Sequence, residues 1–191
     1  LTPYVKATKF DIGDFGEGMI KASAYQGKQV SLPFLISTQV VYYNKNMAKA
    51  KGVSIPSQFK DMNEFLAKVS TLNSDGTTKV WGTIIPGWDQ WYFETFFINN
   101  GVNIINKDGT STDLGGKNSI NTTKEIGRWI KNGYAYFAVG KDGSSKMRQN
   151  FIEGNAFSVI HTSSLYNTYV SKCKNFEVGM AWLPASNTRK Q

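Results

Sequence analysis

The 191-residue chain contains one cysteine and one histidine, and this scarcity excludes several classes of protein. A lone Cys173 cannot form an intrachain disulfide, and it leaves too few thiolates for a cysteine-based zinc site. His161 is the single imidazole, which leaves little for a histidine metal cluster. We therefore expect neither a resident metal ion nor a cofactor.

Long apolar runs and common catalytic motifs are also missing. No stretch approaches the roughly 18 consecutive apolar residues that a membrane-spanning helix needs. No signal peptide is visible in the first ten residues, since they lack a basic stretch followed by an apolar run. The P-loop, the dinucleotide fingerprint and the Gly-x-Ser-x-Gly elbow are absent. The sequence thus argues against the common nucleotide-binding enzymes and hydrolases.

The chain has the composition of a packed domain with an excess of positive charge. Hydrophobic residues make up 40% and charged residues 19%, with 22 basic side chains against 14 acidic ones. The resulting charge of +8 raises the alternative of a nucleic-acid-binding or surface-adhesion module. Because the basic residues are scattered, with Arg189-Lys190 as their only adjacent pair, we expect no nucleic-acid partner.

Extended segments alternate with helical ones, which predicts an α/β layered architecture. The β-branched and aromatic run at 40–43 is typical of a buried strand. Three- and four-residue spacing of apolar residues predicts a helix from Phe59 to Leu72, with Asp61 and Glu64 as a capping box. Further strands are expected at 79–85, 156–160 and 176–183, and further helices at 44–51, 88–100, 122–132, 144–153 and 165–172.

The hydroxyl run Thr162-Ser163-Ser164 lies between a predicted strand and a predicted helix. Backbone N–H groups at a helix start and short hydroxyl side chains converge at such a point, which favours an anion or polyol ligand. A simple helix cap is the alternative interpretation, because Ser and Thr are usual capping residues.

Two other features suggest a ligand cleft. Trp88 follows Pro86-Gly87 at a predicted strand end, where open α/β sheets bind ligands, although it could equally pack under a loop. Ser37-Thr38 places polar groups between two apolar runs, as residues facing a cleft would, or as a hydrated strand end would.

His161 with Ser163 or Ser164 raises the alternative of a hydrolase. The sequence offers no obvious carboxylate to orient the imidazole, and a lone His after a strand is more often structural. We therefore expect a protein without enzymatic activity.

Four segments in the same order carry a family resemblance: YQGKQVSLPFLISTQVVYYNKNMAKAKG, IPSQFKDMNEFLAKV, WYFETFFINNGVNIIN and FIEGNAFSVIHTSSLYNTY. In these segments the chain resembles the extracellular solute-binding proteins of bacterial ABC importers, in the maltodextrin and glycerol-3-phosphate-binding cluster. The resemblance implies an α/β fold of the periplasmic-binding-protein type II. It also implies a fragment, with 1–37 as a remnant of the first lobe, 38–183 as the second lobe and 184–191 as the start of a return crossing.

The resemblance further implies a function. Such a protein captures a small polar solute outside the cytoplasm, a sugar or a sugar or glycerol phosphate, and delivers it to the permease subunits. We expect a monomer, in a periplasm or lipid-anchored at the cell surface, whose two lobes close on the ligand. The implied ligand-binding residues are Ser37, Thr38, Trp88, Thr162, Ser163 and Ser164.

Overall fold

The computed structural model describes residues 1–107 and 109–186, and it divides into two compact units. The first unit is Leu1–Thr38 and the second begins at Gln39. The expected return crossing at 184–191 lies partly outside the described residues, and the basic pair Arg189-Lys190 lies wholly outside them. The assignment of the two units to the lobes of a larger protein stays a prediction.

The first unit has secondary structure but no buried residue. It contains α1 (Thr2–Thr8), α2 (Glu17–Ala22) and the antiparallel pair β1 (Ala24–Tyr25) and β2 (Lys28–Gln29). Its last residues are strongly exposed, with Phe34 at 92% and Leu35 at 84% of their full accessible surface. Because hydrophobic burial is the dominant stabilising contribution to folding, this unit lacks a core of its own.

The second unit is built on a five-stranded mixed sheet with the order β7-β6-β8-β3-β9. The two strands next to β6 both run parallel to it, while β3 runs antiparallel to both of its neighbours. The strands are β3 (Gln39–Asn44), β6 (Thr83–Pro86), β7 (Ala135–Ala138), β8 (Ser158–Thr162) and β9 (Val178–Ala181).

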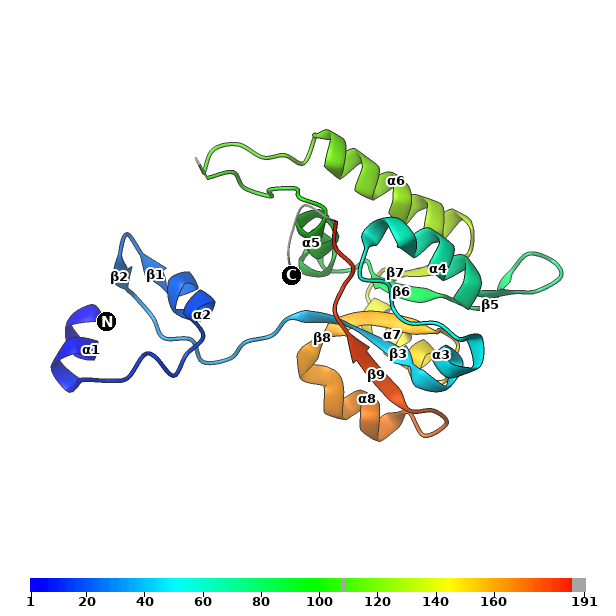
Figure 1. The fold of residues 1–191 in the computed structure, drawn as a ribbon, viewed down its shortest axis with the longest axis horizontal. Helices are drawn as coiled ribbons and strands as arrows, with labels where there is room; N and C mark the ends of the chain where they lie inside the picture. Colours follow the sequence, from blue (N-terminus) through cyan, green and yellow to red (C-terminus); the bar gives the residue numbers. More distant parts are fainter. Residues whose placement is uncertain (108, 187–191) are drawn as a thin grey trace. The chain divides into compact units, whose positions relative to one another are not determined.

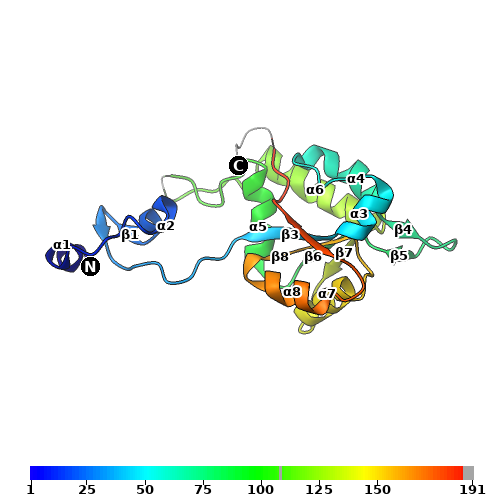
Figure 2. The same cartoon turned by 60° about the horizontal axis from the view of Figure 1, so that its bottom comes forward.

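Helices cover both faces of this sheet (Figures 1 and 2). On one face α3 (Lys45–Lys51), α4 (Met62–Val69) and α6 (Lys117–Lys131) pack over a core that includes Leu66, Trp129 and Phe157. On the other face α7 (Gly143–Ile152) and α8 (Tyr166–Lys172) pack over a second core that includes Tyr42 and Phe151. The predicted α/β layering is therefore confirmed.

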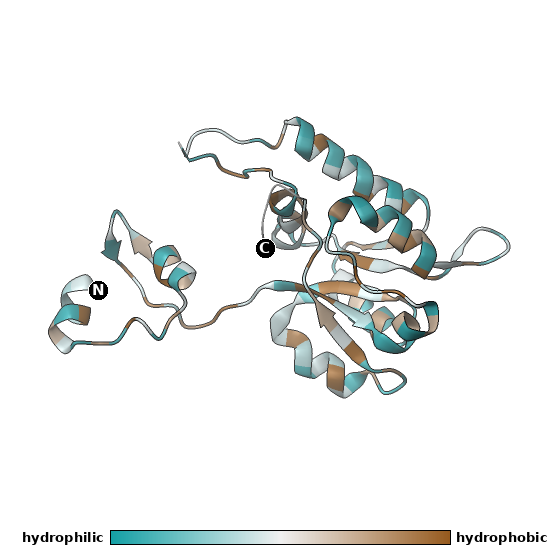
Figure 3. Ribbon diagram, in the orientation of Figure 1, coloured by the Kyte–Doolittle hydropathy of each residue, from teal (hydrophilic) through white to brown (hydrophobic). Residues whose placement is uncertain are grey.

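Hydropathy follows these layers (Figure 3). The apolar residues gather in the strands of the sheet, while the outward faces of α4 and α6 are hydrophilic. Val41 contributes to one core and Val40 to the other, because successive side chains of a strand point to opposite faces. β3 is thus buried on both sides.

The predicted helix from Phe59 to Leu72 was wrong at both ends. A 3₁₀ turn, η1 (Phe59–Asp61), precedes α4, and Asp61 makes no side-chain capping bond. The helix ends at Val69, and the hydroxyl of the following Ser70 donates to the carbonyl of Leu66 at 2.7 Å. The next residues form the hairpin β4 (Thr71–Leu72) and β5 (Thr78–Val80), because β-branched threonines and the Asp75-Gly76 turn favour strands there.

Two other segments also differ from expectation. The strand predicted at 79–85 is divided between β5 and β6, where Gly82 allows the end of α4 to approach the backbone closely. The helix predicted at 122–132 begins earlier, at Lys117, and includes buried Ser119. Asn, Ser and Thr have low helix propensity, so tertiary packing decides where this helix starts.

Two glycine-to-alanine variants give a matched test of the packing. Gly179 in β9 lies under the ring of Tyr43 from β3, so that a Cβ at this position would overlap the ring carbons. We expect Gly179→Ala to lower the free energy of unfolding by about 1–3 kcal/mol. Gly127 in α6 has open space around it, so Gly127→Ala is expected to raise stability by up to about 1 kcal/mol. Urea denaturation measures both, and an equal effect of the two changes would contradict the described register of β3 and β9.

Candidate functional site

The carboxyl ends of the parallel strands form the edge at which the predicted site residues of the second unit gather. β6 ends at Pro86 and is followed by Trp88, while β8 ends at Thr162 and is followed by Ser163 and Ser164. The carboxyl ends of parallel strands are where open α/β sheets bind ligands. We call Trp88, Tyr92, His161, Thr162, Ser163 and Ser164 the strand-end cluster.

Three rings form one side of this cluster. Tyr92, from α5 (Gln90–Asn99), stacks on the imidazole of His161 with ring centroids 5.5 Å apart. The indole of Trp88 meets both rings edge to face, at 5.6 Å from Tyr92 and 6.5 Å from His161. Edge-to-face pairs at such distances are favourable arrangements. Trp88 is therefore held in place by its neighbours.

The first turn of α7 packs closely against Trp88. Gly143 opens this helix, and a Cβ on Gly143 would lie 2.9 Å from a ring carbon of Trp88. A glycine is required here because real Cβ atoms do not approach so closely. Trp88 is half-buried, so part of the indole packs on the protein and part stays accessible.

The hydroxyl loop is fixed by its own hydrogen bonds and by Tyr42. Thr162 caps the short turn η2 (Ser163–Leu165) by accepting from the N–H of Ser164 at 3.4 Å. The Tyr42 hydroxyl donates to the carbonyls of Thr162 and Ser163, at 2.9 and 3.1 Å. The capping interpretation of Thr162 is thus correct. The cap uses the N–H of Ser164, and the hydroxyls of Thr162 and Ser164 lie 3.0 Å apart, within hydrogen-bonding distance of each other.

His161 is a buried, neutral imidazole. Its Nδ1 lies 3.2 Å from the hydroxyl of Tyr169 in α8, and its side chain is only 3% exposed. Burial, and next the positive charge of Arg148, lower the pKa of His161 to about 4. Within the described residues no carboxylate reaches the imidazole, so the orienting group of a Ser–His–carboxylate hydrolase is not found.

Sequence reasoning missed three residues near the cluster. Gln39, which opens β3 opposite Thr162, donates from Nε2 to the carbonyl of Trp91, and its buried Oε1 lacks a hydrogen-bond partner. Trp91 keeps 39% of its surface exposed. Arg148 in α7 is half-buried near His161, without an ion-pair partner in the described part of the chain. Contacts between segments that are distant in sequence bring these three residues to the cluster, and no local sequence pattern indicates their position.

The remaining predicted site residues, Ser37 and Thr38, close the first unit. Both are exposed, and Thr38 directly precedes Gln39 in the chain. Their part in a ligand site therefore stays a prediction.

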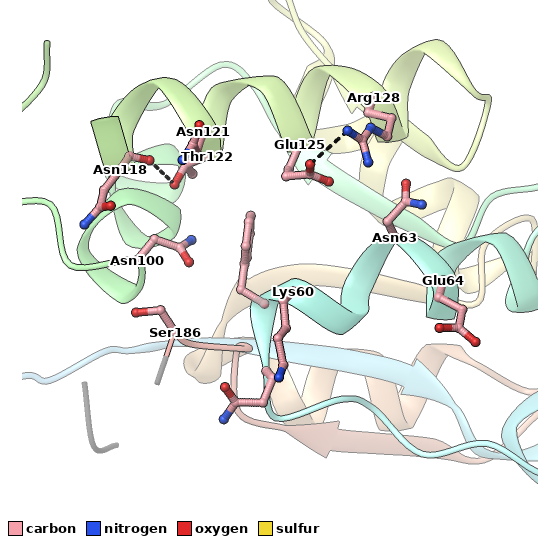
Figure 4. Close-up of a pocket in the computed structure, with 12 residues that line it drawn as sticks. Lys60, Asn63, Glu64, Asn100, Asn118, Asn121, Thr122, Glu125, Arg128 and Ser186 are labelled. Carbon is pink, nitrogen blue, oxygen red and sulfur yellow. Dashed lines mark hydrogen bonds and ion pairs between the residues drawn. The ribbon is translucent and has the colours of Figure 1, made fainter. Parts of the chain in front are cut away.

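A separate groove of about 580 Å³ lies between η1, α4 and α6 (Figure 4). Its lining is mostly amides and charged groups, and Glu125 pairs with Arg128 on its wall at 3.2 Å. The residues labelled in the figure are Lys60, Asn63, Glu64, Asn100, Asn118, Asn121, Thr122, Glu125, Arg128 and Ser186. None of the predicted site residues lines this groove.

Neither a metal cluster nor a membrane span is found in residues 1–107 and 109–186. No group of three or more potential metal ligands comes together there. None of the described helices combines the length and hydropathy needed to traverse a bilayer.

Comparison with known families identifies the chain. The family model for bacterial extracellular solute-binding proteins matches residues 3–190. The chain belongs to this family. The resemblance noted in the sequence is thereby confirmed for nearly the whole chain.

Curated relatives of this solute-binding chain are distant and considerably longer. A binding protein of Brucella abortus is 25% identical over 181 residues, which cover 92% of this chain and 43% of the relative. The maltodextrin-binding protein MdxE of Bacillus subtilis is 26% identical, covering 76% of this chain and 35% of its own. The chain therefore spans less than half the length of these relatives.

Solved structures of solute-binding proteins share its fold. The sugar-binding protein MalE of Xanthomonas citri matches with a TM-score of 0.80 and 16% identity, covering 98% of this chain and 48% of that one. UgpB of Mycobacterium tuberculosis, in complex with glycerophosphocholine, matches with a TM-score of 0.77 and 18% identity, covering 96% and 45%. The predicted fold class, an α/β periplasmic-binding-protein fold, is confirmed.

The buried imidazole gives a pH-dependent prediction. Because the unfolded chain binds a proton near pH 6.5 and the folded chain only near pH 4, the unfolded state binds more protons between these values. The free energy of unfolding should therefore decrease as the pH falls from 6.5 to 4, by up to about 3 kcal/mol in total from His161. Urea denaturation of the wild type and of His161→Gln measures this, and the variant should lose that part of the slope.

The single histidine makes a direct check possible. Its imidazole carbon-bound protons give the only histidine signals in a proton–carbon correlation spectrum of this chain. Their titration should report a pKa near 4 in the folded state. A titration near 6.5 would show that the ring is solvated and would contradict its burial against Tyr92 and Tyr169.

Proposed function

We propose that this chain belongs to the substrate-binding component of an ABC importer, which captures a small polar solute and presents it to the permease. The observation that carries the proposal is the family match over residues 3–190. The strand-end cluster supports it, because a half-buried indole and a hydroxyl loop lie together at the carboxyl edge of the sheet. Trp88 then packs on the ligand, while Thr162, Ser163 and Ser164 hydrogen-bond to its oxygens. Ser37 and Thr38 are proposed as further ligand-binding residues.

Two ligand classes fit these groups, a carbohydrate and a glycerol-3-phosphate-like anion. An aromatic face and clustered hydroxyls suit the sugar. Arg148 supports the phosphate, because a half-buried guanidinium near His161 and Tyr92 favours an anion. Both ligand classes occur in the names of similar proteins. DasA of Streptomyces coelicolor is named a diacetylchitobiose-binding protein, and UgpB was solved in complex with glycerophosphocholine.

The remaining properties follow from this role. The protein acts as a receptor without catalysis, and it acts as a monomer, in a periplasm or lipid-anchored at the cell surface. In the part of the chain that the structure describes, the hydrogen-bonding neighbour of the His161 ring is the Tyr169 hydroxyl and not a carboxylate, which argues against a Ser–His–carboxylate hydrolase. A lack of disulfides is compatible with an exported bacterial protein that folds through its hydrophobic core alone.

A ligand screen tests the proposal. The melting temperature of the full-length gene product is measured with maltose, maltotetraose, diacetylchitobiose, sn-glycerol 3-phosphate and glycerophosphocholine. A ligand that binds the folded state raises the melting temperature, by an amount that depends on its concentration. Stabilisation by neutral sugars alone would rule out the phosphate ligand, and stabilisation by none of these compounds would count against the proposed function.

Trp88 should be central to binding of either ligand class. We expect Trp88→Ala to weaken the ligand identified in the screen by at least about tenfold, since buried aromatic anchors dominate binding energies. Trp81→Phe is the matched control, because Trp81 immediately precedes Gly82 at the opposite end of β6 and packs on Tyr136. Titration calorimetry measures both variants, and equal affinity of Trp88→Ala and wild type would show that the ring only packs under its loop.

A further inference from the structure

One large aromatic side chain at the ligand edge is left unexplained by the strand-end cluster. Trp182 follows β9 directly, and 68% of its surface is exposed. By comparison, Trp129 is 1% exposed and Trp88 is half-buried. Large exposed aromatic rings are a feature of ligand-recognition surfaces.

The register of the sheet places Trp182 in line with the cluster. In the β3–β8 pair Val40 lies opposite His161, and in the β3–β9 pair Val41 lies opposite Ala181. One step further along β3 and β9, Val40 therefore comes opposite Trp182. Directly opposed residues share a face of the sheet, so His161, Val40 and Trp182 form a row across three strands.

A small hollow lies under this ring. Val40, Met180, Ala181 and Trp182 line about 180 Å³ at the edge of the sheet. This lining is almost entirely apolar, in contrast to the hydroxyl loop at the end of β8. We call these four residues the apolar shelf; it lies at the edge strand β9, beside the hydroxyl loop.

The spacing of strands sets the distance between the shelf and the cluster. Neighbouring strands lie about 4.8 Å apart, so Trp182 on β9 is two strands, or roughly 10 Å, from the end of β8. A ligand of the size of glycerol phosphate, bound at Trp88 and the hydroxyl loop, does not reach that far. A sugar chain of several rings does.

We propose that Trp182 is a specificity-determining residue that stacks on an outer ring of an oligosaccharide whose inner ring occupies the strand-end cluster. This inference rests on the proposed function and selects, from its two ligand classes, the oligosaccharide. The apolar face of a pyranose fits the indole and the hollow beside it. Contact with Trp182 therefore distinguishes long from short sugar chains, independently of the contacts at Trp88.

The test compares a short and a long sugar on the full-length gene product. Calorimetry with maltose and maltotetraose should show tighter binding of maltotetraose by the wild type. Trp182→Ala should weaken maltotetraose roughly three- to tenfold and leave maltose within about twofold, because only the longer sugar reaches the shelf. Trp182→Phe, which keeps an aromatic ring, should recover most of the loss.

Leu72→Ala is the control, since Leu72 is 45% exposed and lies in β4, far along the chain from the strand ends. It should change neither affinity. The inference is overturned by an equal loss for both sugars in Trp182→Ala, by no loss for either, or by equal wild-type affinities for the two sugars. Binding of sn-glycerol 3-phosphate alone overturns the inference and leaves the proposed function standing, whereas binding of no ligand in the screen refutes the proposed function itself.

Discussion

The central position of β3 is the constraint on which the second unit depends. This strand is buried on both faces and hydrogen-bonds to β8 on one side and β9 on the other. Its register sets Gln39 opposite Thr162 and Val40 opposite His161. A shift by one residue would move every side chain to the opposite face. Both hydrophobic cores and the strand-end cluster therefore depend on the same register of β3 with its two neighbours.

The same strand connects packing to the candidate site. Tyr42 lies in the second core, and its hydroxyl holds the carbonyls of Thr162 and Ser163. Burial raises the pKa of Tyr42 to about 12, so the hydroxyl stays a proton donor at neutral pH. These two hydrogen bonds restrain the backbone of the hydroxyl loop without a ligand, and a preorganised loop loses less conformational entropy on binding.

Much of the fold could be predicted because it follows local patterns. The strand at 40–43 and the helix ending at Gly52 are encoded by β-branched residues and by a left-handed glycine at the helix end. The start of α6 could not be predicted, since buried Ser119 and Thr122 are held there by tertiary contacts against poor propensity. The positions of Trp88 and the hydroxyl loop after strands made them candidate site residues, and their part in a ligand site stays a prediction. The places of Gln39 and Arg148 beside the strand-end cluster could not be predicted, because their partners Trp91 and His161 are distant in sequence.

The sequence by itself determined the α/β class, the family and the residues that follow the parallel strands, because these depend on periodicity and on short ordered motifs. Tertiary structure alone decided that His161 is a neutral ring stacked on Tyr92, and that Trp182 lies in line with it across the sheet. Strand order and register bring together segments more than a hundred residues apart. No local pattern contains that information, since the pairing energy is shared among strands that meet only in the folded chain.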